Sequence, residues 1–278
     1  MKNKKNSMDY KYKVIIPTYR EDKQLNKCLR WIKRINKLDK VIVINDNEID
    51  YNLNIKYKSV KILNTGGGYW WGGSINFGIK KLIKVGADFV ILLNSDNWAK
   101  SDIVNKLIRK YDKNSSIIHA ATVVNQNDIV RCTSGQINFY TYEVRMFNHK
   151  EEKQNLNSNK YYGNYNGGMG VLIPINVIRK IGYLDESFKL SADREYFYRA
   201  YKYGIPVCAY EDIIIYTDDD HKAIDRSKIK SKNKIQYKLL SPLNFRSPVY
   251  YKTIYKFYKK HSDKPFLYTI NALINYFI

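Results

Sequence analysis

Val14-Ile15-Ile16-Pro17-Thr18 begins the part of the chain that decides the fold, and two similar stretches follow it: Val41-Ile42-Val43-Ile44-Asn45-Asp46 and Phe89-Val90-Ile91-Leu92-Leu93-Asn94-Ser95-Asp96. Each stretch is a continuous apolar run that ends in polar residues. Such runs, without alternation, are typical of strands buried on both faces in a parallel sheet. Between them, apolar residues recur at helical spacing, which predicts helices within 21–36, 75–83 and 103–108. The alternation predicts an α/β fold with a mostly parallel sheet flanked by helices.

Polar residues stand at the end of each predicted strand: Thr18, Asp46, Asn64, Asn94 and Asp96. Because open α/β sheets bind ligands outside the carboxyl ends of their strands, we expect these side chains to converge on one crevice. Asp96 is the best candidate ligand for a hard divalent cation, which can neutralise a diphosphate. The alternative is that Asn94 or Asp96 only caps the next helix or closes a turn.

The composition excludes several classes of protein. The 278 residues are 44% hydrophobic, enough for a core, so a disordered chain is excluded. The three cysteines lie far apart and form no CxxC pair, which argues against a disulfide scaffold and a cysteine-ligated zinc site. The chain has no GxxxxGK[ST] and no GxSxG motif, and its glycines at 66–68 and 72–73 do not fit GxGxxG. P-loop, hydrolase-elbow and dinucleotide-binding chemistry are therefore disfavoured.

Positive charge is concentrated near the C-terminus. The chain carries 48 Lys and Arg against 26 Asp and Glu, a net charge of +22, and residues 222–278 hold 13 of the former and 2 of the latter. Nucleic acid, anionic lipid and phosphorylated substrates are candidate partners; a biased codon usage is the alternative explanation for the average basicity. Residues 1–8 have no apolar core and predict no signal peptide. We expect a soluble or peripheral intracellular protein.

Two amphipathic helices are predicted in this C-terminal region. Tyr250, Ile254, Phe257 and Tyr258 share one helical face among lysines, and the nearly uncharged run 266–278 carries an apolar stripe. That run is too short to span a bilayer but suits an interfacial helix on an anionic membrane. The alternative is that both helices pack on the core or on a partner subunit. The expected organisation is a domain over 10–221 and a basic, aromatic helical extension over 222–278.

The chain resembles inverting family 2 glycosyltransferases of the GT-A fold, especially a bacterial rhamnosyltransferase-like branch. The resemblance rests on six segments in the family's order: 14–19, 41–47, 64–79, 87–96, 168–173 and 181–188, the last continuing to Asp193 and Arg199. It implies a Rossmann-like, mostly parallel sheet flanked by helices. It also implies transfer of a sugar from dTDP-rhamnose or a UDP-sugar to a hydroxyl of a glycan or lipid-linked acceptor in cell-surface polysaccharide synthesis.

The resemblance also implies a donor site. The residues that it assigns to the nucleotide-sugar donor are Pro17, Thr18, Tyr19, Asp46, Asn76, Asn94 and Asp96. Asn94-Ser95-Asp96 occupies the place of the family's DxD, so binding of Mg²⁺ or Mn²⁺ rests mainly on Asp96. The family often has a metal-binding His where this chain has Tyr216 or Thr217. We expect His221 or the aspartates 218–220 to replace it.

Asp193 matches the general base of the family's Glu-Asp motif, whose Glu is Ala192 here. An inverting transfer needs one carboxylate to deprotonate the acceptor hydroxyl. Glu195 is a second candidate base, and the alternative from the residues alone is that Asp193 caps the following helix. Trp70, Trp71 and Gly168 are expected to contact the acceptor or a sugar ring, with at most one of the adjacent tryptophans facing the site.

Three other functions remain as alternatives. A catalytically inactive GT-A protein that binds a nucleotide sugar fits Ala192 and Asn94. A nucleic-acid-binding protein fits the charge but lacks a recognisable RNA- or DNA-binding motif. A nucleotidyltransferase would need glycines after the first strand, where this chain has Pro17-Thr18-Tyr19-Arg20. The expected location is the cytoplasm or the inner face of the cell membrane, and the sequence leaves the oligomeric state open.

Overall fold

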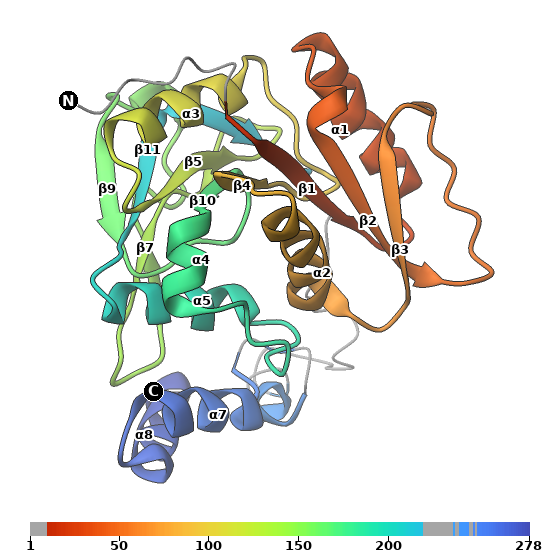
Figure 1. Ribbon diagram of the computed structural model, residues 1–278. Helices are drawn as coiled ribbons and strands as arrows, with labels where there is room; N and C mark the ends of the chain where they lie inside the picture. Colours follow the sequence, from red (N-terminus) through yellow and green to blue (C-terminus); the bar gives the residue numbers. More distant parts are fainter. Residues whose placement is uncertain (1–9, 219–235, 237–238, 245–246, 248) are drawn as a thin grey trace. The chain divides into compact units, whose positions relative to one another are not determined.

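The computed structural model describes residues 10–218, 236, 239–244, 247 and 249–278 (Figure 1). These residues form two compact units. The first comprises the described residues up to Gly135 together with Met146–Asp218, and the second comprises Gln136–Arg145 together with the described residues after Asp218. The boundary expected at 221/222 lies outside the described residues.

The first unit is built on one large sheet. Its strands are β1 (Tyr12–Thr18), β2 (Val41–Glu48), β3 (Lys61–Gly66), β4 (Phe89–Leu92), β5 (Ile118–Val124), β6 (Val130–Cys132), β9 (Lys160–Gly163), β10 (Val171–Pro174) and β11 (Val207–Tyr216). Its helices are α1 (Asp22–Arg34), α2 (Trp70–Lys84), α3 (Ile103–Lys113), α4 (Ile175–Ile181) and α5 (Ala192–Lys202), with short 3₁₀ turns η1 (Leu38–Lys40) and η2 (Lys153–Asn155).

The strand order is β3-β2-β1-β4-β10-β5-β11-β9, with β6 paired to β5. Strands β1 to β4 are mutually parallel, as are β5 and β11, whereas β10 runs antiparallel to both β4 and β5. The predicted mostly parallel α/β sheet is therefore confirmed. The antiparallel strand β10 joins its two parallel parts, and all four of its side chains are buried.

Helices cover both faces of this sheet, as Figure 1 shows. The stripe of α1, including Leu25 and Leu29, packs with α3 on the face that carries Val14 and Ile16. On the opposite face α2 lies so close to β1 that a Cβ at Gly78 would be 2.9 Å from Ile15. Burial of both faces explains why the strands read as uninterrupted apolar runs.

The second unit joins two distant parts of the chain. Strands β7 (Gly135–Ile137) and β8 (Val144–Met146) pair as a hairpin, and helices α7 (Tyr251–His261) and α8 (Pro265–Phe277) follow the 3₁₀ turn η4 (Ser241–Leu243). The Tyr258 hydroxyl donates a 2.6 Å hydrogen bond to the Phe139 carbonyl, and the two rings meet edge to face at 5.3 Å. Both C-terminal helices exist as predicted, and they pack on this hairpin.

Candidate active site

The loop after β1 is held against the end of β2. The Tyr19 hydroxyl donates a 3.0 Å hydrogen bond to the Glu48 carboxylate, and the Arg20 guanidinium forms an ion pair with the same group. Pro17 and Thr18 are the last residues of β1 and are buried. The buried Thr18 hydroxyl has no polar partner within the described part of the chain.

Asp46, at the end of β2, holds the beginning of α2. Its carboxylate accepts hydrogen bonds from the Thr65 hydroxyl and from the backbone N–H groups of Tyr69, at 3.1 Å, and Trp70, at 2.8 Å. A negative charge at a helix N-terminus is stabilised by the helix dipole. Trp70 itself has φ of +60°, a conformation that costs energy outside glycine and that this bond helps to hold. Asp46 therefore positions the glycine-rich segment, a task that the sequence did not indicate.

A cavity of about 500 Å³ opens at the ends of β2 and β3. Amide side chains line it: Asn45 donates to Asn64 at 2.9 Å, and Asn47 donates to Asn45 at 2.5 Å. Tyr51 adds an aromatic wall. Such a mixture of amides and a ring suits a ligand with hydrogen-bonding edges, such as a nucleobase or ribose. Apart from Asn64, these residues were not among the expected ligand contacts, although Asn45 and Asn47 flank Asp46.

Trp71 connects two of the predicted site segments. Its indole N–H donates a 2.9 Å hydrogen bond to the Asn94 side chain. Gly168 has φ of +72°, and a Cβ placed there would lie 2.6 Å from two atoms of the Trp71 ring. The indole ring therefore lies directly on the Gly168 backbone, and three expected site residues meet in one contact. Trp70, by contrast, contributes its backbone to Asp46.

Asp96 lies beside the end of β11. Its carboxylate accepts a hydrogen bond from the Thr217 hydroxyl and one of 3.2 Å from the Asn97 amide, and the residue is 4% exposed. Trp98 and Tyr216 exchange two backbone hydrogen bonds, and their rings stack at 4.4 Å. Tyr216 and Thr217, the two residues at which a family His was expected, thus lie at the strand end where Thr217 contacts Asp96. His221 lies outside the described residues.

The fit of a divalent cation can be judged from the donor atoms. Among the described residues, no group of three or more His, Cys, Asp and Glu side chains is arranged to hold a metal ion. Asp96 offers one buried carboxylate at the strand end. Magnesium is commonly bound through one or two carboxylates together with substrate phosphates. Asp96 can therefore supply one carboxylate, already bonded to Thr217 and Asn97, to a cation whose other ligands come from a diphosphate.

Asp193 is in the first turn of α5. The N-cap position is Ser191, so Asp193 lies one residue inside the helix, where backbone N–H groups of the first turn donate to its carboxylate. Asp193 is half-buried, and its carboxylate accepts a long, 3.5 Å hydrogen bond from the Tyr165 hydroxyl. Burial raises the pKa of this carboxyl, against the opposing influence of Arg194. A carboxylate with a raised pKa is a better proton acceptor near neutral pH.

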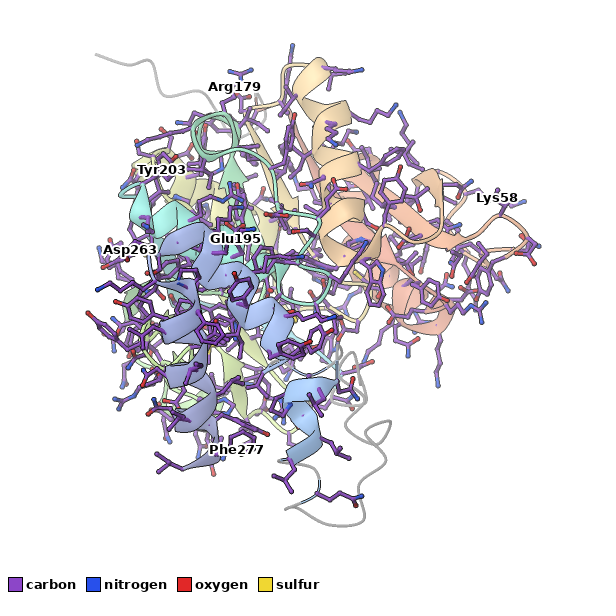
Figure 2. The ribbon with its side chains drawn as sticks, turned by 90° about the horizontal axis from the view of Figure 1, so that it is seen from below. Lys58, Arg179, Glu195, Tyr203, Asp263 and Phe277 are labelled. Atoms are coloured by element: carbon purple, nitrogen blue, oxygen red, sulfur yellow. The ribbon has the colours of Figure 1, made fainter. Side chains whose placement is uncertain are left out.

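Glu195, the second candidate base, is fully buried on α5, where Figure 2 labels it. Its two carboxylate oxygens accept hydrogen bonds of 2.8 and 2.9 Å from the Arg199 guanidinium. Arg199 also donates to the backbone carbonyls of Ile181 and Tyr183. The Glu195–Arg199 pair thus connects α5 to the end of α4 and the segment that follows it. Because both oxygens of Glu195 are bound to Arg199, Asp193 is the better candidate base.

Close packing explains the residue before Asp193. A Cβ at Gly72 in α2 would lie only 2.8 Å from the Cβ of Ala192 in α5. Ala192 is 3% exposed, so a larger side chain there would meet the α2 backbone. The close approach of α2 and α5 therefore leaves little room for a Glu side chain at position 192.

Asn76 acts from inside α2. It is 1% exposed, and its side chain donates to the Leu184 carbonyl and to the Glu186 carboxylate, each at 2.9 Å. Its carbonyl oxygen accepts a 3.1 Å hydrogen bond from the Leu184 N–H. These bonds fix the segment that leads to α5, so any effect of Asn76 on a donor passes through this segment.

The first turn of α2 joins these parts. Trp70 contacts Asp46, Trp71 contacts Asn94 and Gly168, and Gly72 contacts the residue before Asp193. The sequence did not reveal the Tyr165 and Thr217 contacts, because each joins residues that are distant along the chain. The paired glycines 72–73 were the available signal for close helix packing.

Comparisons with known proteins bear on the family and the fold of the chain. The profile of glycosyl transferase family 2 matches residues 13–171. A crystal structure of GalNAc-T7 with UDP, GalNAc and Mn²⁺ superposes with a TM-score of 0.61 at 12% identity, over 91% of this chain and 54% of that one. The chain therefore spans about half the length of the GalNAc-T7 chain.

Staphylococcus aureus TarS, residues 1–349, superposes with a TM-score of 0.51 at 15% identity, over 96% of this chain and 89% of that one. No curated protein sequence matches significantly. The structural likenesses show a shared GT-A fold, and the sequence profile covers more than half of the chain. The chain belongs to glycosyltransferase family 2.

Proposed function

We propose that this protein transfers a sugar, with inversion at the anomeric carbon, from a nucleoside-diphosphate sugar to a hydroxyl of a glycan or lipid-linked acceptor. The observation that carries the proposal is the set of contacts made by the first turn of α2. This turn contacts Asp46 and Asn94, which are assigned to the donor, and Ala192, which precedes the candidate base. A sugar and its diphosphate need those groups within reach of one another. We propose dTDP-rhamnose or a UDP-sugar as donor and cell-surface polysaccharide synthesis as the setting.

Asp193 is the proposed general base. Its carboxylate takes the proton from the acceptor hydroxyl while that oxygen forms a bond to the anomeric carbon. The bond from the anomeric carbon to the diphosphate oxygen breaks, and the nucleoside diphosphate leaves with its electron pair. The half-buried position of Asp193, which raises its pKa, supports this role.

On the donor side, the amide-lined cavity beside Asn45 and Asn64 is the proposed nucleoside site. Asp96 would hold Mg²⁺ or Mn²⁺ together with the diphosphate. Such a cation, when bound, stabilises the charge of the departing diphosphate. His221 remains proposed as a further metal ligand. Trp71, seated on Gly168, is the tryptophan proposed to contact a sugar ring.

The alternative of an inactive nucleotide-sugar-binding protein rested on Ala192 and Asn94. The packing of Gly72 on Ala192, and the bond from Trp71 to Asn94, give each residue a structural reason. We therefore prefer the active enzyme. We also propose that it works in the cytoplasm at the inner face of the membrane, where a lipid-linked acceptor would be reached. Within the described residues, no helix is both long and apolar enough to cross a bilayer.

A donor screen tests the proposed function. The full chain is incubated with UDP- and dTDP-sugars and Mg²⁺ or Mn²⁺, and the released nucleoside diphosphate is measured. At least one donor should be turned over well above the level of the Asp193→Asn variant. Binding of a nucleoside diphosphate without any turnover above that level would instead support the inactive binding protein.

A further inference from the structure

One side of α8 is apolar and exposed. Exposed fractions are 70% for Phe266, 40% for Ile270, 51% for Ile274 and 42% for Phe277. At 3.6 residues per turn, these side chains project from the same side of the helix. Thr269 is buried on another side, and α8 contains no charged residue. Figure 2 labels Asp263, two residues before α8, and Phe277, the last residue of α8.

The neighbouring helix α7 supplies positive charge. Its lysines are all exposed: Lys252, Lys256, Lys259 and Lys260. The helix contains no acidic residue, and Tyr251 and Tyr255 are 38% and 40% exposed on the same half of its surface. Tyrosine at a water–lipid boundary keeps its hydroxyl in water while its ring meets apolar groups. The second unit therefore presents exposed lysines and tyrosines on α7 and an exposed apolar face on α8.

The other sides of both helices are used within the second unit. Tyr142 meets Phe257 at 5.1 Å, and Phe139 meets Tyr268 at 5.1 Å. The Asn271 side chain donates a 2.8 Å hydrogen bond to the Tyr140 carbonyl. The hairpin thus closes the unit's own aromatic core, and the exposed face of α8 is not needed for it.

We infer that the second unit docks on an anionic lipid surface, with the exposed face of α8 in the interface and the α7 lysines at the headgroups. Thirteen residues are too few to cross a bilayer, and an apolar face beside lysines suits an interfacial helix. Pairing with a second copy would bring the lysine-bearing units together and is disfavoured by like charge. The inference rests on the proposed function for its purpose, since docking brings the enzyme to a lipid-linked acceptor.

Flotation with vesicles of phosphatidylglycerol and phosphatidylcholine in equal parts tests the inference on the full chain. The α8 variant is Ile270→Gln with Ile274→Gln. Its matched control changes two exposed apolar residues of the first unit, Val85→Gln with Tyr203→Gln, which are 65% and 52% exposed. All four positions are exposed, so neither variant removes core packing.

The charge test uses two variants of equal net charge. One replaces three α7 lysines, Lys252, Lys256 and Lys259, by Gln, and the other replaces three exposed lysines of the first unit, Lys58, Lys84 and Lys113. Each lysine at an anionic surface changes binding by about fivefold, so the α7 variant should lose about a hundredfold. The first-unit variant should lose much less.

The expected result is wild-type binding that weakens with salt, is at least about tenfold weaker in the α8 variant, and persists in both controls. Failure of the wild type to float, an unchanged α8 variant, or equal loss in the two lysine variants would overturn the inference. Nucleoside diphosphate release without vesicles is measured for the same proteins. It should be unchanged in the α8 variant, so failure of the proposed function is seen independently of vesicle binding.

Discussion

Replacing Gly168 by Ala should damage both stability and the site, because two separate penalties meet there. The first is conformational: Gly168 has φ of +72°, and a side chain in the left-handed region costs about 1–2 kcal/mol. The second is steric: the new Cβ would lie 2.6 Å from two atoms of the Trp71 ring. Ordinary carbon contacts lie near 3.5–4.0 Å, so the ring must move by about 1 Å.

Movement of the Trp71 ring would also disturb Asn94, in the segment that carries Asp96. The indole N–H is 2.9 Å from the Asn94 oxygen, and a shift of that size stretches or breaks the bond. Overpacking costs about 1–3 kcal/mol and a lost hydrogen bond about 1 kcal/mol. With the backbone strain, Gly168→Ala should lower the free energy of unfolding by about 3–6 kcal/mol. Donor turnover should fall with it.

Urea denaturation measures this, and Gly86→Ala is the matched control. Gly86 has φ of +71°, almost the same as Gly168, but a Cβ there would meet nothing within 4 Å. The control should lose only the backbone share, about 1–2 kcal/mol. Equal losses in the two variants would refute the proposed seating of Trp71. In a Trp71→Leu background, Gly168→Ala should cost only the backbone share of about 1–2 kcal/mol, because the clashing ring is gone.

Three further predictions follow from other contacts. Ala192→Glu should lower the free energy of unfolding by about 1–3 kcal/mol, because it overpacks against Gly72; an unchanged free energy in urea denaturation would contradict the packing. Asp96→Ala should weaken nucleoside diphosphate binding in calorimetry with Mn²⁺ but much less without it. Equal wild-type affinities with and without Mn²⁺ would show that no cation takes part in donor binding. Burial lowers the pKa of His119 to about 4, so only the unfolded chain gains this proton between pH 6.5 and 4. Stability should fall by about 3 kcal/mol as pH drops through that window, and His119→Gln should remove that share of the pH dependence.

The first half of the fold could be predicted because its signals are local. Strands such as Val41–Ile44 are continuous apolar runs, and the stripe of α1 lies at helical spacing. The antiparallel insertion of β10 between β4 and β5 could not be predicted. An apolar run such as Val171-Leu172-Ile173 suits a buried strand of either direction. The C-terminal helices were likewise predicted, but periodicity shows which face is buried and not what covers it.

The site could be predicted as a set of strand ends but not as a set of contacts. Asp46 was expected at the nucleotide, and nothing in its neighbourhood in the sequence revealed that it holds the start of α2. Glu195 looked like a second base until Arg199, one helical turn away, proved to bind both of its oxygens. Such roles depend on which polar group is already satisfied, and only the folded chain determines that.

Asp193→Asn tests the central claim most directly. Turnover of the best donor is measured in parallel with calorimetric binding of its nucleoside diphosphate, in the wild type and in the Asn variant. Because an amide cannot accept the acceptor's proton, we predict a loss of turnover of about 10²–10⁴-fold with unchanged nucleotide affinity. Wild-type turnover in the Asn variant would contradict the assignment of Asp193 as the base and, with it, the mechanism proposed for this chain.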